Sequence, residues 1–162
     1  MTQAYFNGAN ISVRTNTMQP LPHHYQVKAT GRSSGSVTLS SAGLADIQSA
    51  PPAEFDGPGD QWSPETLLLA AVGDCFILSV RAVAAASNFE FTSLECVTEG
   101  TLDRVDRTTR FTDIVNTVTL TMPADGSDTL AHRLHEKAEE VCLVSNSLSA
   151  NVQLVTKVVN AT

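Results

Sequence analysis

The sequence predicts an α+β fold in which antiparallel hairpins surround one buried helix. Three observations lead to this prediction. Several short segments alternate between apolar and polar residues, with the period of two that is typical of strands. Residues 67–86 are apolar or small almost without interruption, which is typical of a helix buried on all sides. Residues 127–142 instead carry their apolar side chains on one side of a helix.

The first hairpin is expected near the N-terminus. Residues 25–30 alternate between apolar and polar side chains, and residues 37–40 do so again. The segment between them, Gly31-Arg32-Ser33-Ser34-Gly35, has the composition of a turn, so the three segments predict a β-hairpin. Residues 1–22 are polar and irregular. We interpret them as an N-terminal arm, in which an early edge strand is an alternative, and assign residues 23–162 to a single domain.

The buried helix has clear start and stop signals. Ser63 is the expected N-cap, Pro64 occupies the first helical position, and Glu65 places an acid in the first turn. Residues 88–89 are expected to end the helix. The preceding residues 50–61 are rich in proline and acidic residues and predict an exposed loop. An all-apolar helix of this length is expected in the middle of the fold or of a dimer.

The second half of the chain predicts another hairpin, an amphipathic helix and a last strand. Residues 91–103 and 111–122 are the expected strands, joined by a charged tip over residues 103–110. Residues 152–157 alternate again and predict the final strand. Ser127 is the expected cap of the second helix. The apolar stripe of that helix is expected to consist of Leu130, Leu134, Ala138, Val141 and Cys142.

Composition excludes several classes of protein. Ten Lys and Arg against 17 Asp and Glu give a net charge of −7, which argues against a nucleic-acid or anionic-membrane surface. The most apolar stretch contains Asp74 and Arg81, which are costly in lipid, so no membrane span is expected. The first ten residues lack the basic and apolar parts of a signal peptide. The expected location is therefore the cytoplasm.

Thiol chemistry is the best candidate for an activity. In a reducing compartment the three cysteines are expected to be reactive or buried rather than linked structurally. Cys75 follows Gly73 and Asp74 inside the apolar helix, and two interpretations stay open. Cys75 could be a small core residue. Alternatively, the helix could kink at Gly73, with Asp74 capping a new turn whose N-terminus lowers the pKa of Cys75.

The remaining candidates are weaker. Cys142 lies at a helix end, where a resolving thiol could move, or it is simply packed against the core. Cys96 falls on the inward face of a strand and is interpreted as structural. His132 and His135, with Glu136 and Glu139 nearby, could form a metal site. Both histidines lie off the predicted apolar stripe, however, so a solvated face is favoured and no metal is expected.

Several of these motifs together resemble the OsmC/Ohr family, the osmotically inducible protein C and organic hydroperoxide resistance proteins. They are Ser63-Pro64-Glu65 followed by the Leu- and Ala-rich run, Cys75, and Cys142 with Val144-Ser145 after it. Ala29-Thr30-Gly31-Arg32 with Gly35 is also similar to the first hairpin turn of the family. The resemblance covers roughly residues 24–158.

The resemblance implies an OsmC-like fold, an intertwined homodimer with two active sites at the subunit interface, and no cofactor or metal. It implies a thiol peroxidase that reduces organic hydroperoxides to alcohols. Cys75 would be oxidised to a sulfenic acid and then form a disulfide with the resolving Cys142. Arg32 would stabilise the Cys75 thiolate, and Glu65 would hold that arginine. The electron donor would be a dithiol, and a dihydrolipoyl group serves some relatives.

Two residues depart from the family pattern. The family often has proline after the second cysteine, where this chain has Leu143, and the charge of Asp74 opposes a neighbouring thiolate. The same fold therefore has non-enzymatic alternatives. One is a redox sensor or a dimer that binds a hydrophobic small molecule. The other is a structural protein with inert thiols.

Overall fold

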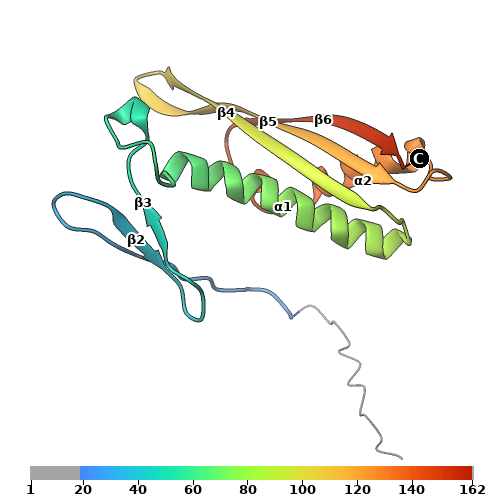
Figure 1. Cartoon of the computed structure of the whole chain (residues 1–162), viewed down its shortest axis with the longest axis horizontal. Helices are drawn as coiled ribbons and strands as arrows, with labels where there is room; N and C mark the ends of the chain where they lie inside the picture. The colour runs from blue at the N-terminus through green and yellow to red at the C-terminus, as the bar shows by residue number, and fades with distance from the viewer. Residues whose placement is uncertain (1–18, 162) are drawn as a thin grey trace, which may run out of the picture.

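A computed structural model describes residues 19–161 and confirms the α+β class. Figure 1 shows a main sheet lying along one side of a long central helix, and a small sheet set apart from both. The predicted order of elements is found, with an additional short strand and two short 3₁₀ segments. The elements are β1 Lys28–Thr30, β2 Val37–Ser40, β3 Ile47–Ser49, η1 Ala53–Phe55, α1 Pro64–Ser87, β4 Ser93–Val105, β5 Thr108–Met122, α2 Asp128–Glu140, η2 Ser145–Ser147 and β6 Asn151–Asn160.

The main sheet has the order β4-β5-β6. β4 and β5 form the predicted antiparallel hairpin, with Cys96 opposite Val118 and Thr98 opposite Asn116. β5 and β6 are parallel, because α2 carries the chain back along the sheet before β6 begins. The charged hairpin tip is much shorter than residues 103–110. Both strands continue to a two-residue turn whose residues, 106 and 107, have positive φ angles of 50° and 69°, as the twist of a tight hairpin requires.

Helix α1 begins and ends where the sequence predicts. The Ser63 hydroxyl accepts a hydrogen bond from the Thr66 amide, and the Thr66 hydroxyl accepts one from the Ser63 amide. Asn88 ends the helix in the left-handed conformation, with φ 52°. Of the two interpretations left open for Cys75, the kink at Gly73 is wrong, because α1 is one uninterrupted helix. Cys75 therefore lies in mid-helix, without the partial positive charge of a helix N-terminus.

Gly73 serves close packing instead. A Cβ at this position would lie 2.7 Å from the hydroxyl oxygen of Thr98 on β4, too close for an unchanged core. Its neighbours on the same face of α1 pack against the sheet and α2. The core they form contains Phe76, Val80, Ala84, Val118, Leu120, Met122, Ala131, Leu134 and Ala138.

The rest of the chain buries only part of the surface of α1. Its most apolar 18-residue window has a mean hydropathy of 2.0, yet only 28% of that window is buried. By length and composition alone α1 could cross a membrane, but the core helix of a globular protein meets the same criterion. Asp74 and Arg81 lie on the helix, and its inner face packs on β4 and α2. Within one chain the helix is therefore buried on one side only, and burial of its other side in a dimer stays a prediction.

Helix α2 is capped by Ser127, whose hydroxyl accepts a hydrogen bond from the Leu130 amide. Its buried face is rotated from the predicted stripe, since Leu130 and Val141 are 52% and 42% exposed. The buried residues are Ala131, Leu134, His135, Ala138 and, just beyond the helix, Cys142. The prediction that His135 lies on a solvated face is wrong, because a residue four positions from Ala131 shares its side of the helix.

The small sheet has the order β1-β2-β3 and is antiparallel throughout. Its first strand is shorter than residues 25–30, and Tyr25 is 90% exposed. The sequence did not predict β3, because three residues are too few to show a period. A backbone hydrogen bond from Ala50 to the carbonyl of Trp62 ties the end of this sheet to the start of α1. The predicted arm lies mostly outside the described residues, so its boundary stays a prediction.

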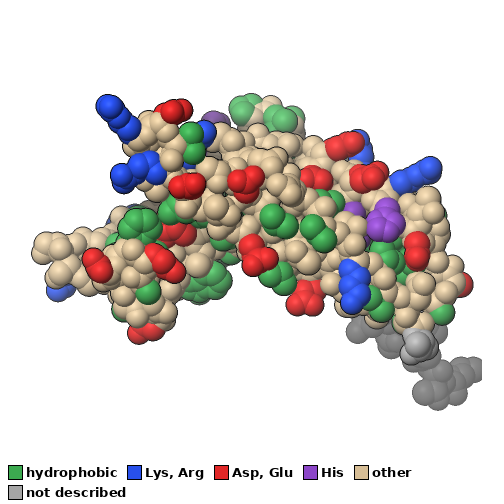
Figure 2. Space-filling model, turned by 90° about the horizontal axis from the view of Figure 1, so that it is seen from above, with side chains coloured by type: hydrophobic (Ala, Val, Ile, Leu, Met, Phe, Trp, Pro, Cys, Tyr) green, Lys and Arg blue, Asp and Glu red, His purple; other side chains and the backbone are tan. Residues whose placement is uncertain are grey.

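The distribution of charged side chains on the surface agrees with the acidic composition. Figure 2 shows carboxylate side chains scattered over the visible face, with the basic side chains mostly toward its two ends. Hydrophobic side chains also reach this surface in several places.

Candidate active site

The structure brings Cys75 and Cys142 together. Cys75 lies half-buried in the middle of α1, and burial raises the pKa of its thiol. Hydrogen bonding and charge from Cys142 raise that pKa further, since two adjacent thiolates would repel each other. The backbone amides of Val144 and Leu143 act in the opposite direction, because they stabilise a thiolate at Cys75. The segment after α2 thus supplies both a second thiol and two N–H donors.

Cys142 is fully buried immediately after α2. The amide of Cys142 donates to the carbonyl of Glu139, and its carbonyl accepts from the amide of Asn146. The hydroxyl of Ser145 donates to the sulfur, with 3.2 Å between Oγ and Sγ. A donor at this position stabilises a thiolate. All three cysteines lie in the described part of the chain and are free thiols.

Glu65 occupies the first turn of α1, ten residues before Cys75, which corresponds to ~15 Å along the helix. One of its carboxylate oxygens, Oε2, is buried and has no hydrogen-bond partner within residues 19–161. A buried oxygen of this kind normally has a donor. The carboxylate borders a cavity of about 230 Å³ whose other walls are Val37, Ser49, Ala50, Pro51, Pro52, Phe55 and Pro64.

Arg32 lies exposed in the turn between β1 and β2. It forms no ion pair with Glu65. Within the part of the chain that the structure describes, the single ion pair joins Lys137 to Glu140 at 2.7 Å. The structure therefore assembles the two cysteines of the expected site and leaves Arg32 and Glu65 unpaired in one chain.

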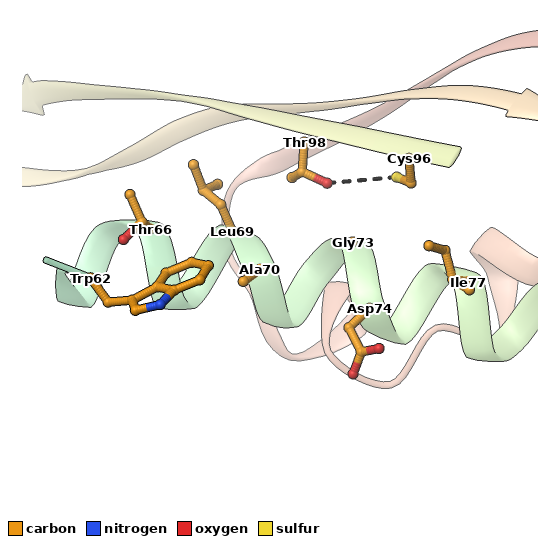
Figure 3. A pocket seen from close by; sticks show the side chains of 9 residues that line it. All are labelled: Trp62, Thr66, Leu69, Ala70, Gly73, Asp74, Ile77, Cys96 and Thr98. Carbon is orange, nitrogen blue, oxygen red and sulfur yellow. Dashed lines mark hydrogen bonds between the residues drawn. The ribbon is translucent and has the colours of Figure 1, made fainter. Parts of the chain in front are cut away.

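A second cavity, of about 420 Å³, lies along α1 next to β4 (Figure 3). Its lining is mostly apolar and contains Trp62, Thr66, Leu69, Ala70, Gly73, Asp74, Ile77, Cys96 and Thr98. Asp74 points away from the strand, and its carboxylate is exposed. Cys96 does face inward, as the alternation predicted, but it borders this cavity and is only half-buried. No pattern in the sequence indicated this cavity.

His135 is an unexpected feature of the core. It is 0% exposed, its ring lies 6.2 Å from the ring of Phe76, and both ring nitrogens lack partners within residues 19–161. Burial, with a smaller effect from the charge of the nearby His132, lowers the pKa of His135 to about 4. His132 is exposed, and its Nδ1 lies 3.0 Å from the hydroxyl of Thr156. The described residues contain no cluster of three or more His, Cys, Asp or Glu arranged to hold a metal.

Comparison with known proteins identifies the class to which this fold and site belong. Residues 57–157 match the family model for OsmC-like proteins. The chain is also 31% identical, over 137 residues, to the uncharacterized protein YmaD of Bacillus subtilis, covering 82% of this chain and 91% of that protein. The chain therefore belongs to the OsmC-like protein family.

Solved structures agree with this assignment. An OsmC-like protein of unknown function from Vibrio cholerae has a TM-score of 0.76 at 18% identity, covering 84% of this chain and 100% of the other. An organic hydroperoxide resistance protein OsmC from Legionella pneumophila has a TM-score of 0.69 at 26% identity, covering 86% and 99%. The first shows the fold alone. The second shows that this chain resembles a protein named for resistance to organic hydroperoxides.

Proposed function

We propose that this protein is a thiol-dependent peroxidase that reduces organic hydroperoxides to alcohols. The observation that carries the proposal is the placement of the Cys142 thiol and the amides of Leu143 and Val144 beside the Cys75 thiol. A peroxidase of this type needs a nucleophilic sulfur, donors that stabilise its anion, and a second thiol within reach. The family and its members named for hydroperoxide resistance support the same activity.

In the proposed reaction Cys75 acts first and Cys142 second. The Cys75 thiolate attacks one peroxide oxygen, the O–O bond breaks, and the alkoxide leaves as the alcohol after taking a proton. Cys75 is then a sulfenic acid. The Cys142 thiol displaces its hydroxyl as water and forms the Cys75–Cys142 disulfide. An external dithiol, for which a dihydrolipoyl group is one candidate, reduces the disulfide in the cytoplasm.

Arg32 and Glu65 complete the site in a homodimer. A second copy of the chain would bring its Arg32 to the buried, partnerless Oε2 of Glu65, where a guanidinium satisfies the oxygen and supports the Cys75 thiolate. The uncovered apolar surface of α1 supports such an association, since an obligate dimer buries this kind of surface. The small sheet, set apart from its own main sheet, is suited to reach a partner (Figure 1).

A second candidate is a redox sensor or a dimer that binds a hydrophobic small molecule. The raised pKa of Cys75 in the single chain favours it, because a thiol that stays protonated at neutral pH reacts slowly with peroxide. The mostly apolar cavity beside Glu65 could hold such a molecule.

Steady-state consumption of cumene hydroperoxide, with a dithiol reductant, distinguishes the two. We expect many turnovers by the wild type and none by Cys75→Ser. A wild type that oxidises once and stops would contradict the peroxidase and support the sensor. A Cys75 that fails to react with a thiol label at neutral pH would contradict both and leave a structural protein with inert thiols.

A further inference from the structure

One face of α1 that the rest of the chain leaves open carries both an acid and a base. Ala70, Asp74, Leu78, Arg81 and Ala85 are all exposed. At about 100° per residue, these five positions lie within about 80° of one another around the helix axis. They therefore form one face, which we call the outer face. Asp74 points away from β4 (Figure 3), and Leu78 is 51% exposed.

Asp74 and Arg81 do not satisfy each other within one chain. They are seven residues apart, which places them ~10 Å apart along the helix axis. Side chains on a helix pair at a spacing of three or four residues. Within residues 19–161 neither side chain forms an ion pair. Both charges are therefore open to a partner that approaches the outer face.

The outer face is complementary to itself. When two identical helices dock antiparallel about a two-fold axis, the numbers of facing residues add up to a constant. If Asp74 faces the partner's Arg81, then Ala70 faces the partner's Ala85, and Leu78 lies at the axis beside the partner's Leu78. The axis that pairs the charges thus also places the large apolar side chain at the centre and small residues at both ends. This is the arrangement of a contact surface, with an apolar centre and polar groups around it.

Docking also changes the surroundings of Cys75. In a single chain Asp74 is exposed, so water screens its charge. A second copy on the outer face would remove that water from a carboxylate whose neighbour in the sequence is Cys75. An unpaired buried carboxylate is costly, and its charge disfavours a nearby thiolate. A guanidinium paired with it removes both effects.

Resting on the proposed function as a homodimeric peroxidase, we propose that α1 docks antiparallel on α1 of a second copy, with Asp74 paired to the partner's Arg81 on each side of the axis. Arg81 is then a positioning residue for the partner's site. It neutralises the carboxylate next to the reactive cysteine of the other chain, so each site is complete only in the dimer.

Charge reversal tests this pairing on the full chain. Asp74→Arg and Arg81→Asp should each dimerise at least about tenfold more weakly than the wild type, because each brings like charges together on both sides of the axis. A mixture of the two variants restores both opposite-charge pairs, so the mixed dimer should return to within about threefold of the wild-type dissociation constant. Arg133→Asp is the matched control, because it reverses an exposed charge on α2. Analytical ultracentrifugation measures association, and circular dichroism verifies folding.

The outcomes separate this inference from the peroxidase function. Variants that associate as tightly as the wild type, with no preference for each other, would contradict the pairing. A wild type that stays monomeric, or that binds phosphatidylcholine vesicles through α1 instead, would contradict it as well. Association is measured without peroxide. A wild type that passes this test but fails to turn over cumene hydroperoxide would therefore contradict the peroxidase and leave the docking intact.

The pH dependence of Cys75 alkylation tests the effect on the site. In the Arg81→Gln dimer Asp74 stays unpaired, so the midpoint of alkylation should rise by about one pH unit. Asp74→Asn combined with Arg81→Gln removes both charges and should return the midpoint to that of the wild type. Mass spectrometry of the Cys75 peptide measures the reaction, with Arg133→Gln as the control. An unchanged midpoint in dimeric Arg81→Gln would show that this arginine does not act on the partner's Cys75.

Discussion

The hydroxyl of Ser145 donates a hydrogen bond to the sulfur of Cys142, with 3.2 Å between the two atoms. Cys142 has no exposed surface, so water cannot take the place of this donor. In the proposed cycle the sulfur carries negative charge both when it attacks the Cys75 sulfenic acid and when a reductant later releases it. Ser145 is therefore positioned to assist the proposed resolving thiol rather than the thiol proposed to meet the peroxide.

Replacing Ser145 by alanine should slow disulfide formation about fivefold, corresponding to the loss of one hydrogen bond of about 1 kcal/mol. The first reaction of Cys75 with peroxide should keep its rate. Rapid quenching with an alkylating reagent separates the two steps. Ser149→Ala is the matched control, because Ser149 is exposed and lies in the same segment. A change in the peroxide step, or an equal effect of Ser149→Ala, would contradict this role.

Substituting Gly73 by alanine should destabilise the protein by about 1–2 kcal/mol. Alanine gains about 1 kcal/mol of helix propensity over glycine, but its Cβ would lie 2.7 Å from the Thr98 hydroxyl, which is anchored on Asn116. Chemical denaturation measures the difference in free energy of unfolding. Combining Gly73→Ala with Thr98→Ala should cost less than the two single changes added together. Strict additivity would show that the contact with Thr98 is not the cause.

Gly73 also shows which parts of the fold the sequence can predict and which depend on tertiary packing. Caps, hairpins and helices were predictable because Ser63, Asn88 and alternating residues act locally. A glycine in a helix has two local explanations, a kink or a close contact, and only the position of Thr98 decides between them. Tertiary packing likewise turned α2 so that His135, and not Leu130, faces the core.

The candidate site was predictable to a similar extent. The contexts of Cys75 and Cys142 indicated a thiol pair, and the structure places the two thiols together. The cavity that Cys96 borders could not be foreseen, because it exists only once β4 packs against α1. The expected pairing of Arg32 with Glu65 stays a prediction, because one chain does not bring them together.

His135 should make the protein less stable in mild acid. Its pKa is about 4 in the folded state and 6.5 unperturbed, so the unfolded state binds the proton more readily between these values. The contribution is fully present above pH 6.5 and declines as pH falls toward 4, by about 3 kcal/mol in total. Glu139, whose pKa burial raises, works in the opposite direction in mild acid.

Comparing variants separates the effect of His135 on the pH dependence of stability from that of Glu139. Urea unfolding of His135→Leu between pH 7 and pH 4.5 should show a much flatter dependence on pH than that of the wild type. His24→Gln is the matched control, since His24 is exposed and belongs neither to α2 nor to the core. If His135→Leu keeps the slope of the wild type, proton uptake by His135 does not cause the loss of stability.

Arg32 and Glu65 should act across the proposed homodimer, and mixed dimers can test this expectation. Arg32→Ala and Glu65→Gln should each slow peroxide reduction about tenfold or more without unfolding the protein, because the Cys75 thiolate loses its charged support. If Arg32 of one subunit meets Glu65 of the other, a dimer of one Arg32→Ala chain and one Glu65→Gln chain keeps one intact pair. Dimers purified by two different tags should then recover about half the wild-type activity. If the pair forms within one chain, every site in the mixed dimer carries one substitution, and no activity is recovered.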